Sequence, residues 1–204
     1  MICKPYQVLA NSCEYRYEEK RSIFTALLIP VVNREQALAA VADTRRAHPG
    51  ASHYCWAYIL GDSEQPQAQA FSDDGEPAGT AGKPILNVLG HRRAGDCLAV
   101  VVRIFGGVKL GSGGLVRAYS QSVSQALDEA QWRLITPAST VSIQVDFAQE
   151  ERVRHCLTQA GLQVEHADYQ QSVRLRVSVP QNQLQGLENS VREVTGGQAS
   201  MSIE

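Results

Sequence analysis

Apolar residues recur with two different periods along the last third of the chain. A period of two marks strands, and helical spacing marks the stretches between them. In chain order the pattern gives a strand at 141–147, a helix at 153–160, strands at LQVEHADY and 173–179, a helix opening at Pro180, and a strand at 199–203. Gly161 and Gly196-Gly197 end the two helices. This β-α-β-β-α-β order predicts a ferredoxin-like domain over residues 138–204.

The first 137 residues predict a second α+β domain with longer strands, and ITPAST (135–140) is the expected linker between the two. The expected elements are two or three strands within residues 6–31, a helix around 33–47, a strand at HYCWAYIL (53–60), a short helix at PILNVLG, a strand at DCLAVVVRIF and a helix opening on GSGG. HYCWAYIL is apolar on both faces, so it should be covered on both sides. Pro84 should lie in the first turn of its helix, and Gly90 just past the end.

Charge and cysteine content narrow the class of protein. The net charge is −2, and Lys and Arg outnumber Asp and Glu only up to residue 137, by 14 to 13, against 5 to 8 afterwards. Any site for a polyanion is therefore expected in the first domain. No apolar run is long enough to span a bilayer, no secretory signal is evident, and the five cysteines form no CxxC. We expect a cytoplasmic protein with reduced thiols and no membrane partner.

Glycines concentrate in two loops, since ten of the sixteen lie between residues 75 and 114. GGVKLGSGG (106–114) precedes a helix, where backbone N–H groups and the helix dipole attract anions. Lys109 and Arg117 would complete such a site for phosphate or carboxylate. Ser112 stands where a Walker loop has Lys, and Val116 where a dinucleotide loop has Gly, so neither nucleotide fingerprint fits. The alternative is that these glycines serve a bulge and a tight turn.

The other glycine-containing loop, FSDDGEPAGTAGKP (71–84), is acidic. Asp73, Asp74 and Glu76 are candidates for holding Mg²⁺ or for acid–base chemistry. Alternatively, they cap the following helix or pair with basic residues. We expect the two loops to form opposite walls of one cleft, so that Asp74 or Glu76 lies within ion-pair or one-water reach of Lys109, Arg103 or Arg117.

His53 and Cys55 should share one face of their strand. They are either a Cys–His couple, two ligands of a metal, or a packed pair. The zinc-deaminase pattern requires a Glu two residues after the His and a PCxxC, and neither is present. A packed His beside a buried Cys is therefore the favoured interpretation. In the second domain Arg174 and Arg176 share a face without stacking aromatics, so this domain is expected to bind protein.

Four blocks of sequence together resemble the IMPACT family: KRSIFTA (20–26), ASHYCWAY (51–58), FSDDGEPAGTAGKPIL (71–86) and VVRIFGGVKLGSGGLVRAY (101–119). The resemblance implies a first domain with the left-handed β-α-β fold of elongation factor G domain IV, shared with a ribosomal protein domain and with galactokinase-type kinases. It implies a second domain similar to domain V of that factor. Eukaryotic members act in translational control through a partner protein.

The resemblance also implies a shared surface without catalytic roles. Its residues would be Lys20, Arg21, Ser22, His53, Asp73, Asp74, Gly75, Glu76, Lys83, Arg103, Gly106, Gly107, Lys109, Gly111, Gly113, Gly114 and Arg117.

The favoured function is a translation-associated regulatory protein that binds RNA or the ribosome through this glycine-rich, mixed-charge cleft. The phosphate contacts would come from Lys20, Arg21, Lys83, Arg103, Lys109 and Arg117, with the acidic loop orienting them or holding Mg²⁺, the one cofactor considered. One alternative is a phosphotransferase-like enzyme that holds nucleotide phosphates in the glycine loop. Another is a protein-docking regulator without nucleic-acid contact, acting on a translation-related partner.

Overall fold

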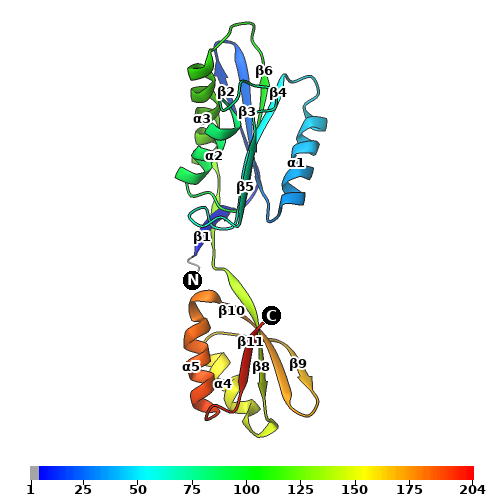
Figure 1. The fold of residues 1–204 in the computed structure, drawn as a ribbon, viewed down its shortest axis with the longest axis vertical. Coiled ribbons are helices and arrows are strands. Elements are labelled where there is room, and N and C mark those ends of the chain that lie inside the picture. Colours follow the sequence, from blue (N-terminus) through cyan, green and yellow to red (C-terminus); the bar gives the residue numbers. More distant parts are fainter. Residues whose placement is uncertain (1–4) are drawn as a thin grey trace. The chain divides into compact units, whose positions relative to one another are not determined.

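The computed structural model describes residues 5–204, which form two compact α+β units (Figure 1). The N-terminal unit comprises residues 6–135, and the C-terminal unit comprises residues 136–204 with Pro5. The expected α+β class is confirmed, and each unit has its own hydrophobic core. Among residues 5–204, no helix is both long and apolar enough to cross a membrane.

An antiparallel five-stranded sheet forms the centre of the N-terminal unit. In spatial order its strands are β2 (Cys13–Glu19), β3 (Ser22–Pro30), β6 (Cys97–Ile104), β4 (His53–Leu60) and β5 (Ala68–Ser72). The helices of this unit are α1 (Arg34–Ala47), α2 (Gly82–His91) and α3 (Ser112–Glu129). A separate antiparallel pair joins β1 (Tyr6–Leu9) to β7 (Trp132–Ile135).

The sheet of the N-terminal unit is covered on both faces. Helices α2 and α3 pack on one face and α1 on the other, as Figure 1 shows. Along β4 the side chains alternate between the two layers, because successive residues of a strand point to opposite faces. Cys55 and Ala57 belong to the core under α2 and α3, whereas Tyr58 and Leu60 belong to the core under α1. The expected burial of this strand on both sides is confirmed.

The C-terminal unit has the predicted ferredoxin-like order. Its antiparallel sheet runs β11 (Ser200–Ile203), β8 (Ala138–Val145), β10 (Val173–Pro180), β9 (Val164–Tyr169). The helices α4 (Glu150–Gln159) and α5 (Leu184–Val194) follow the short 3-10 turns η1 (Phe147–Gln149) and η2 (Gln181–Gln183). One core holds the inward side chains of β8 and β10 against both helices.

Several details differ from the sequence interpretation, among them Phe147, which lies in η1 rather than in the strand expected at 141–147. Gly90 lies inside α2 rather than past its end, and α5 begins at Leu184 because Pro180 is the last residue of β10. The expected linker shrinks to residues 136–137, since β7 ends at Ile135 and β8 begins at Ala138. Strands β5 and β7 were not predicted, because both are short and mostly exposed and so lack a clear apolar alternation.

Candidate functional site

A strained hairpin turn meets the glycine loop at one end of the N-terminal sheet. Lys20 and Arg21 form the two-residue turn between β2 and β3, and both have positive φ, 48° and 65°. Turns of this kind favour Asn-Gly, because other side chains are strained at positive φ. A Cβ on Gly106 would lie 2.1 Å from the backbone of Arg21, so only glycine fits there. The Gly106 N–H donates to Ser22 Oγ (3.2 Å), which ties the turn to the loop.

Four exposed cations gather around this junction, and we call them the cationic rim: Lys20, Arg21, Lys109 and Arg117. Within residues 5–204, none of the four takes part in an ion pair. Lys20 and Arg117 line one cleft of about 510 Å³, together with Glu19 and Gly114. By contrast, the exposed Arg92 and Arg93 past the end of α2 pair with carboxylates. What sets the four rim cations apart from other cations without an ion pair among the described residues, such as Arg16 and Arg34, is that they flank the junction of the β2–β3 turn and the glycine loop.

The N-terminus of α3 faces the rim without a cap of its own. Gly111 occupies the N-cap position with φ 71°, no side chain caps the helix, and its first turn holds no acidic residue. Arg117 folds back over this turn, since a Cβ on Gly113 would lie 3.7 Å from its Nη1. Gly107 also has positive φ, 86°. The free backbone N–H groups in the first turn of α3 therefore lie close to the cationic side chain of Arg117.

Asp73, in the acidic loop, caps α2. Its Oδ1 accepts hydrogen bonds from the N–H groups of Ala81 (3.0 Å) and Gly82 (2.8 Å). Its Oδ2 accepts one from Gly79 (2.8 Å). A carboxylate at this position satisfies N–H groups that have no partner within the helix, and it interacts favourably with the helix dipole. Of the roles considered for Asp73, helix capping is the one that the geometry supports.

Asp74 contacts α1 and β4 rather than the glycine loop. Its Oδ2 accepts from the Tyr54 N–H (2.7 Å), and its Oδ1 pairs with Arg45 of α1. The Arg45 guanidinium also lies over the Tyr54 ring, 4.6 Å from its centroid. Asp74 therefore fixes the acidic loop to the opposite layer of the unit.

Lys83, in the first turn of α2, lies over the exposed ring of Phe71, with its Nζ 5.8 Å from the ring centroid.

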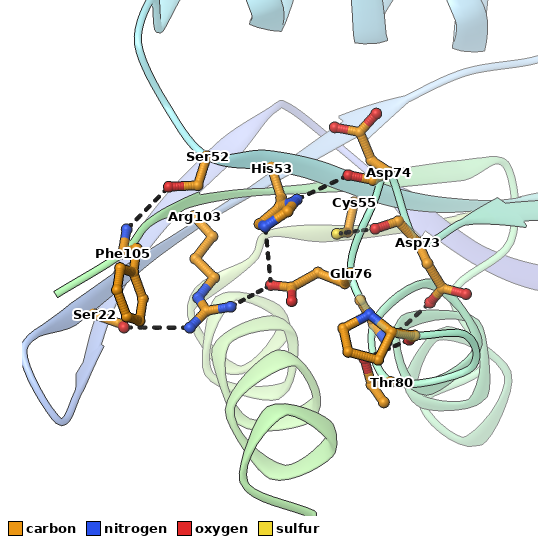
Figure 2. A network of polar contacts seen from close by, with 12 residues as sticks. Ser22, Ser52, His53, Cys55, Asp73, Asp74, Glu76, Thr80, Arg103 and Phe105 are labelled. Atoms are coloured by element: carbon orange, nitrogen blue, oxygen red, sulfur yellow. Dashed lines mark hydrogen bonds and ion pairs between the residues drawn. The ribbon is translucent and has the colours of Figure 1, made fainter. Parts of the chain in front are cut away.

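Glu76 forms the expected ion pair between the acidic loop and the segment that leads to the glycine loop (Figure 2). Its Oε1 lies 2.5 Å from Arg103 Nη1 and accepts from Tyr119 Oη at 2.8 Å. Both charges are buried, with Glu76 8% and Arg103 5% exposed. Arg103 Nη2 reaches Ser22 Oγ at 3.5 Å. The predicted ion pair is thus confirmed for Glu76 and Arg103, a buried residue of β6, whereas the cleft beside the glycine loop is not lined by the acidic loop, so the two loops do not form its opposite walls.

His53 and Cys55 are packed into the same network. His53 Nδ1 lies 2.9 Å from the Asp74 carbonyl oxygen, and Nε2 lies 4.0 Å from Glu76 Oε1. The Cys55 thiol donates to the Asp73 carbonyl oxygen at 2.9 Å. Burial raises the pKa of Cys55 to about 12, so this thiol is protonated at neutral pH and is no nucleophile. Within residues 5–204, no group of three His, Cys, Asp or Glu side chains is placed to hold a metal ion.

Three residues of this network escaped the sequence interpretation. Tyr119 was assigned to the apolar stripe of α3, and its ring is indeed fully buried, but its hydroxyl meets Glu76 and Cys55. The Ser52 hydroxyl accepts from the Phe105 N–H (3.2 Å), and the Phe105 ring stays 47% exposed. A tyrosine on a buried stripe signals a polar partner. No local pattern marks Ser52 or Phe105.

Comparison with known proteins agrees with this architecture. A family model for the Impact N-terminal domain matches residues 20–127, and one for a domain of unknown function (DUF1949) matches residues 143–198. A crystal structure described as that of a hypothetical protein superposes with a TM-score of 0.74 at 35% identity, covering 98% of this chain and 97% of that one.

Three bacterial relatives carry the same family name. IMPACT family member YigZ of Escherichia coli (strain K12) is 42% identical over 80% of each chain. An IMPACT family member of Haemophilus influenzae is 33% identical over 97% of this chain and 96% of its own. YvyE of Bacillus subtilis (strain 168) is 31% identical over 96% of this chain and 89% of its own. The chain therefore belongs to the IMPACT family.

Proposed function

We propose that this protein is a translation-associated regulator that binds RNA, on the ribosome, through the cationic rim. The observation that carries the proposal is that these four cations have no partner among the described residues, although the unit is rich in carboxylates. The nearby carboxylates of the acidic loop are all engaged with other groups. Unpaired cations beside an uncapped helix N-terminus suit phosphate groups, which accept hydrogen bonds and bring negative charge.

The C-terminal unit is expected to contact a protein of the translation machinery. It carries the excess of acidic residues, and its exposed face of β10 bears Arg174 and Arg176 without a Phe, Tyr or Trp beside them among the described residues, while His166 lies opposite Arg176. The face therefore lacks the large aromatic rings of an RNA-recognition sheet. Binding to the ribosome would place the protein in the cytoplasm. The family resemblance to translational regulators supports this division of roles.

The phosphotransferase alternative has less support from the site. It requires a carboxylate that can coordinate Mg²⁺ or act as a base. Asp73 caps α2, Asp74 pairs with Arg45, and Glu76 pairs with Arg103. The role left for the acidic loop is to hold the buried network beneath the rim.

Co-sedimentation with purified ribosomal subunits at two salt concentrations tests the proposal. Each phosphate contact on single-stranded nucleic acid contributes about −0.7 to the slope of log K against log salt. With four contacts, raising salt from about 50 to 200 mM should weaken binding roughly 50-fold. The Lys109→Ala plus Arg117→Ala double variant should show roughly half that slope, a loss of only about 7-fold over the same range.

The matched control is the double variant Arg92→Ala plus Arg93→Ala. It removes the same charge from exposed arginines that already have carboxylate partners, Asp128 and Glu64. Glu64 follows the end of β4, whereas the rim adjoins its beginning, so the control also lies at the other end of the sheet. It should bind like the parent protein. Equal losses in both variants, or binding that does not depend on salt, would refute the proposal.

A further inference from the structure

Phe105 is an aromatic side chain presented at the edge of the cationic rim. It follows the last residue of β6 and immediately precedes Gly106 and Gly107. Its backbone N–H donates to Ser52 Oγ at 3.2 Å, and the Ser52 N–H donates to the Arg103 carbonyl oxygen at 2.8 Å. These two bonds fix the backbone that carries the ring, although 47% of the residue is exposed.

The Phe105 ring lies against the Arg103 guanidinium. The Arg103 guanidinium carbon lies 5.6 Å from its centroid, and it lies 5.4 Å from the centroid of the buried Phe24. Arg103 is in turn held by Glu76, as Figure 2 shows, so it cannot swing away from the ring. A guanidinium against one face of an aromatic ring is itself attractive. The exposed part of Phe105 is therefore a rigid aromatic surface beside unpaired cations.

We propose that Phe105 is a stacking platform for an unpaired nucleobase of an RNA whose phosphates lie on the cationic rim. This inference rests on the proposed function and specifies its ligand as single-stranded or looped RNA. Lys109 follows Phe105 by four residues, so their Cα atoms are at most about 14 Å apart. Base stacking on an aromatic ring next to a basic track is how proteins bind unpaired RNA, whereas paired bases are hidden within the helix.

The charge and the aromatic surface are complementary to this ligand in different ways. Phosphates account for the cations, but a ligand that offered phosphates alone would gain nothing from an exposed ring. An unpaired nucleotide offers both chemistries within one residue.

The test compares two fluorescent RNAs with the same number of phosphates, a single-stranded oligoadenylate and a blunt-ended duplex without a loop. Phe105→Ala should weaken oligoadenylate binding roughly 5- to 150-fold, which corresponds to the 1–3 kcal/mol of one base–aromatic stack. Phe105→Leu, which keeps apolar bulk without a π-face, should lose most of this affinity, and Phe105→Trp should retain it. Duplex affinity should change little in all three variants, because the bases of a duplex are paired.

The control is Phe147→Ala, which removes an exposed ring of the C-terminal unit and should leave both affinities unchanged. Unfolding midpoints would show that each variant is folded. If the Lys109→Ala plus Arg117→Ala protein loses RNA while Phe105→Ala does not, stacking is refuted and the rim proposal stands. If no RNA binds at low salt, both fail. If Phe105→Ala weakens ribosome binding but no free RNA is bound by any form, the ring contacts a ribosomal protein and stacking is refuted.

Discussion

Glu76→Ala should strongly destabilise the N-terminal unit, because it leaves the Arg103 guanidinium buried without its anion. Glu76 is 8% exposed and Arg103 5%, and the pair lies at 2.5 Å. Removing one partner of a buried ion pair typically costs about 3–5 kcal/mol of unfolding free energy. The Tyr119 hydroxyl would lose its acceptor as well, while Arg103 Nε already has no hydrogen-bond partner among residues 5–204. With little left to satisfy either group, we expect a loss near the upper end of that range.

Two further variants divide this loss into its parts. Glu76→Gln keeps an acceptor for Tyr119 and Arg103 but removes the charge, so it should cost roughly 2 kcal/mol. Tyr119→Phe keeps the edge-to-face contact with Phe24, whose ring centroid lies at 5.1 Å, and loses only a hydroxyl. It should cost about 1 kcal/mol. The double replacement Glu76→Leu plus Arg103→Met should be more stable than Glu76→Ala, because no charge is then left buried.

Urea unfolding followed by tryptophan fluorescence reads this unit alone, because Trp56 and Trp132 both lie within it. With an m-value of about 2 kcal/mol/M, a loss of 4 kcal/mol lowers the midpoint by roughly 2 M. A midpoint within ~0.5 M of the parent for Glu76→Ala would refute the reasoning, since it corresponds to only ~1 kcal/mol. In that case Arg103 reaches water or another anion, and the pair does not support the rim.

Three further predictions concern neighbouring residues. Gly106→Ala should destabilise the unit by more than about 2 kcal/mol, because its Cβ would meet the Arg21 backbone. Gly90→Ala in α2 has free space, so it should stabilise the unit by up to about 1 kcal/mol and raise the urea midpoint. Lys20→Asn plus Arg21→Gly should raise the midpoint by relieving roughly 1 kcal/mol of turn strain, while RNA binding measured by anisotropy weakens; an unchanged midpoint would contradict the strain argument. The pKa of Cys55 is raised to about 12 from an ordinary 9.0, so the buried thiol contributes stability that is complete below pH 9 and is lost as the pH rises toward 12. In Cys55→Ala the urea midpoint should therefore fall less steeply above about pH 9 than in the parent protein.

Periodic stretches of the sequence predict most of the fold, because long elements with one buried face leave a clear signature. The alternation in β10 and the two-sided burial of β4 are examples. Short exposed strands such as β7 leave none, since their pairing depends on a partner more than a hundred residues away. The fold class of each unit could therefore be predicted from the sequence, whereas short exposed strands such as β7 could not.

The candidate site was predictable in composition but not in its internal contacts. Turn-rich acidic and glycine sequences indicated two loops near a site, yet the three carboxylates of the acidic loop have three different partners, none of them in the glycine loop. Asp73 caps a helix, Asp74 reaches α1, and Glu76 reaches β6. Sequence spacing cannot distinguish these roles, because the partners come from separate elements brought together only by the sheet. The burial of Arg103, which separates it from the exposed cations, likewise follows from the register that places it beside His53 and Phe24.

The arrangement of strain and charge around the rim favours a role in binding over one in stability. Two cationic residues occupy a turn in which Asn-Gly would be relaxed, and like charges gathered beside a helix N-terminus repel one another and the helix dipole. Beneath them, the buried pair of Glu76 and Arg103 costs desolvation that well-packed apolar residues would avoid. Each of these features weakens the isolated protein. An anion that covers the rim offsets the repulsion between the cations, and the fixed turn and ring lose little entropy on binding.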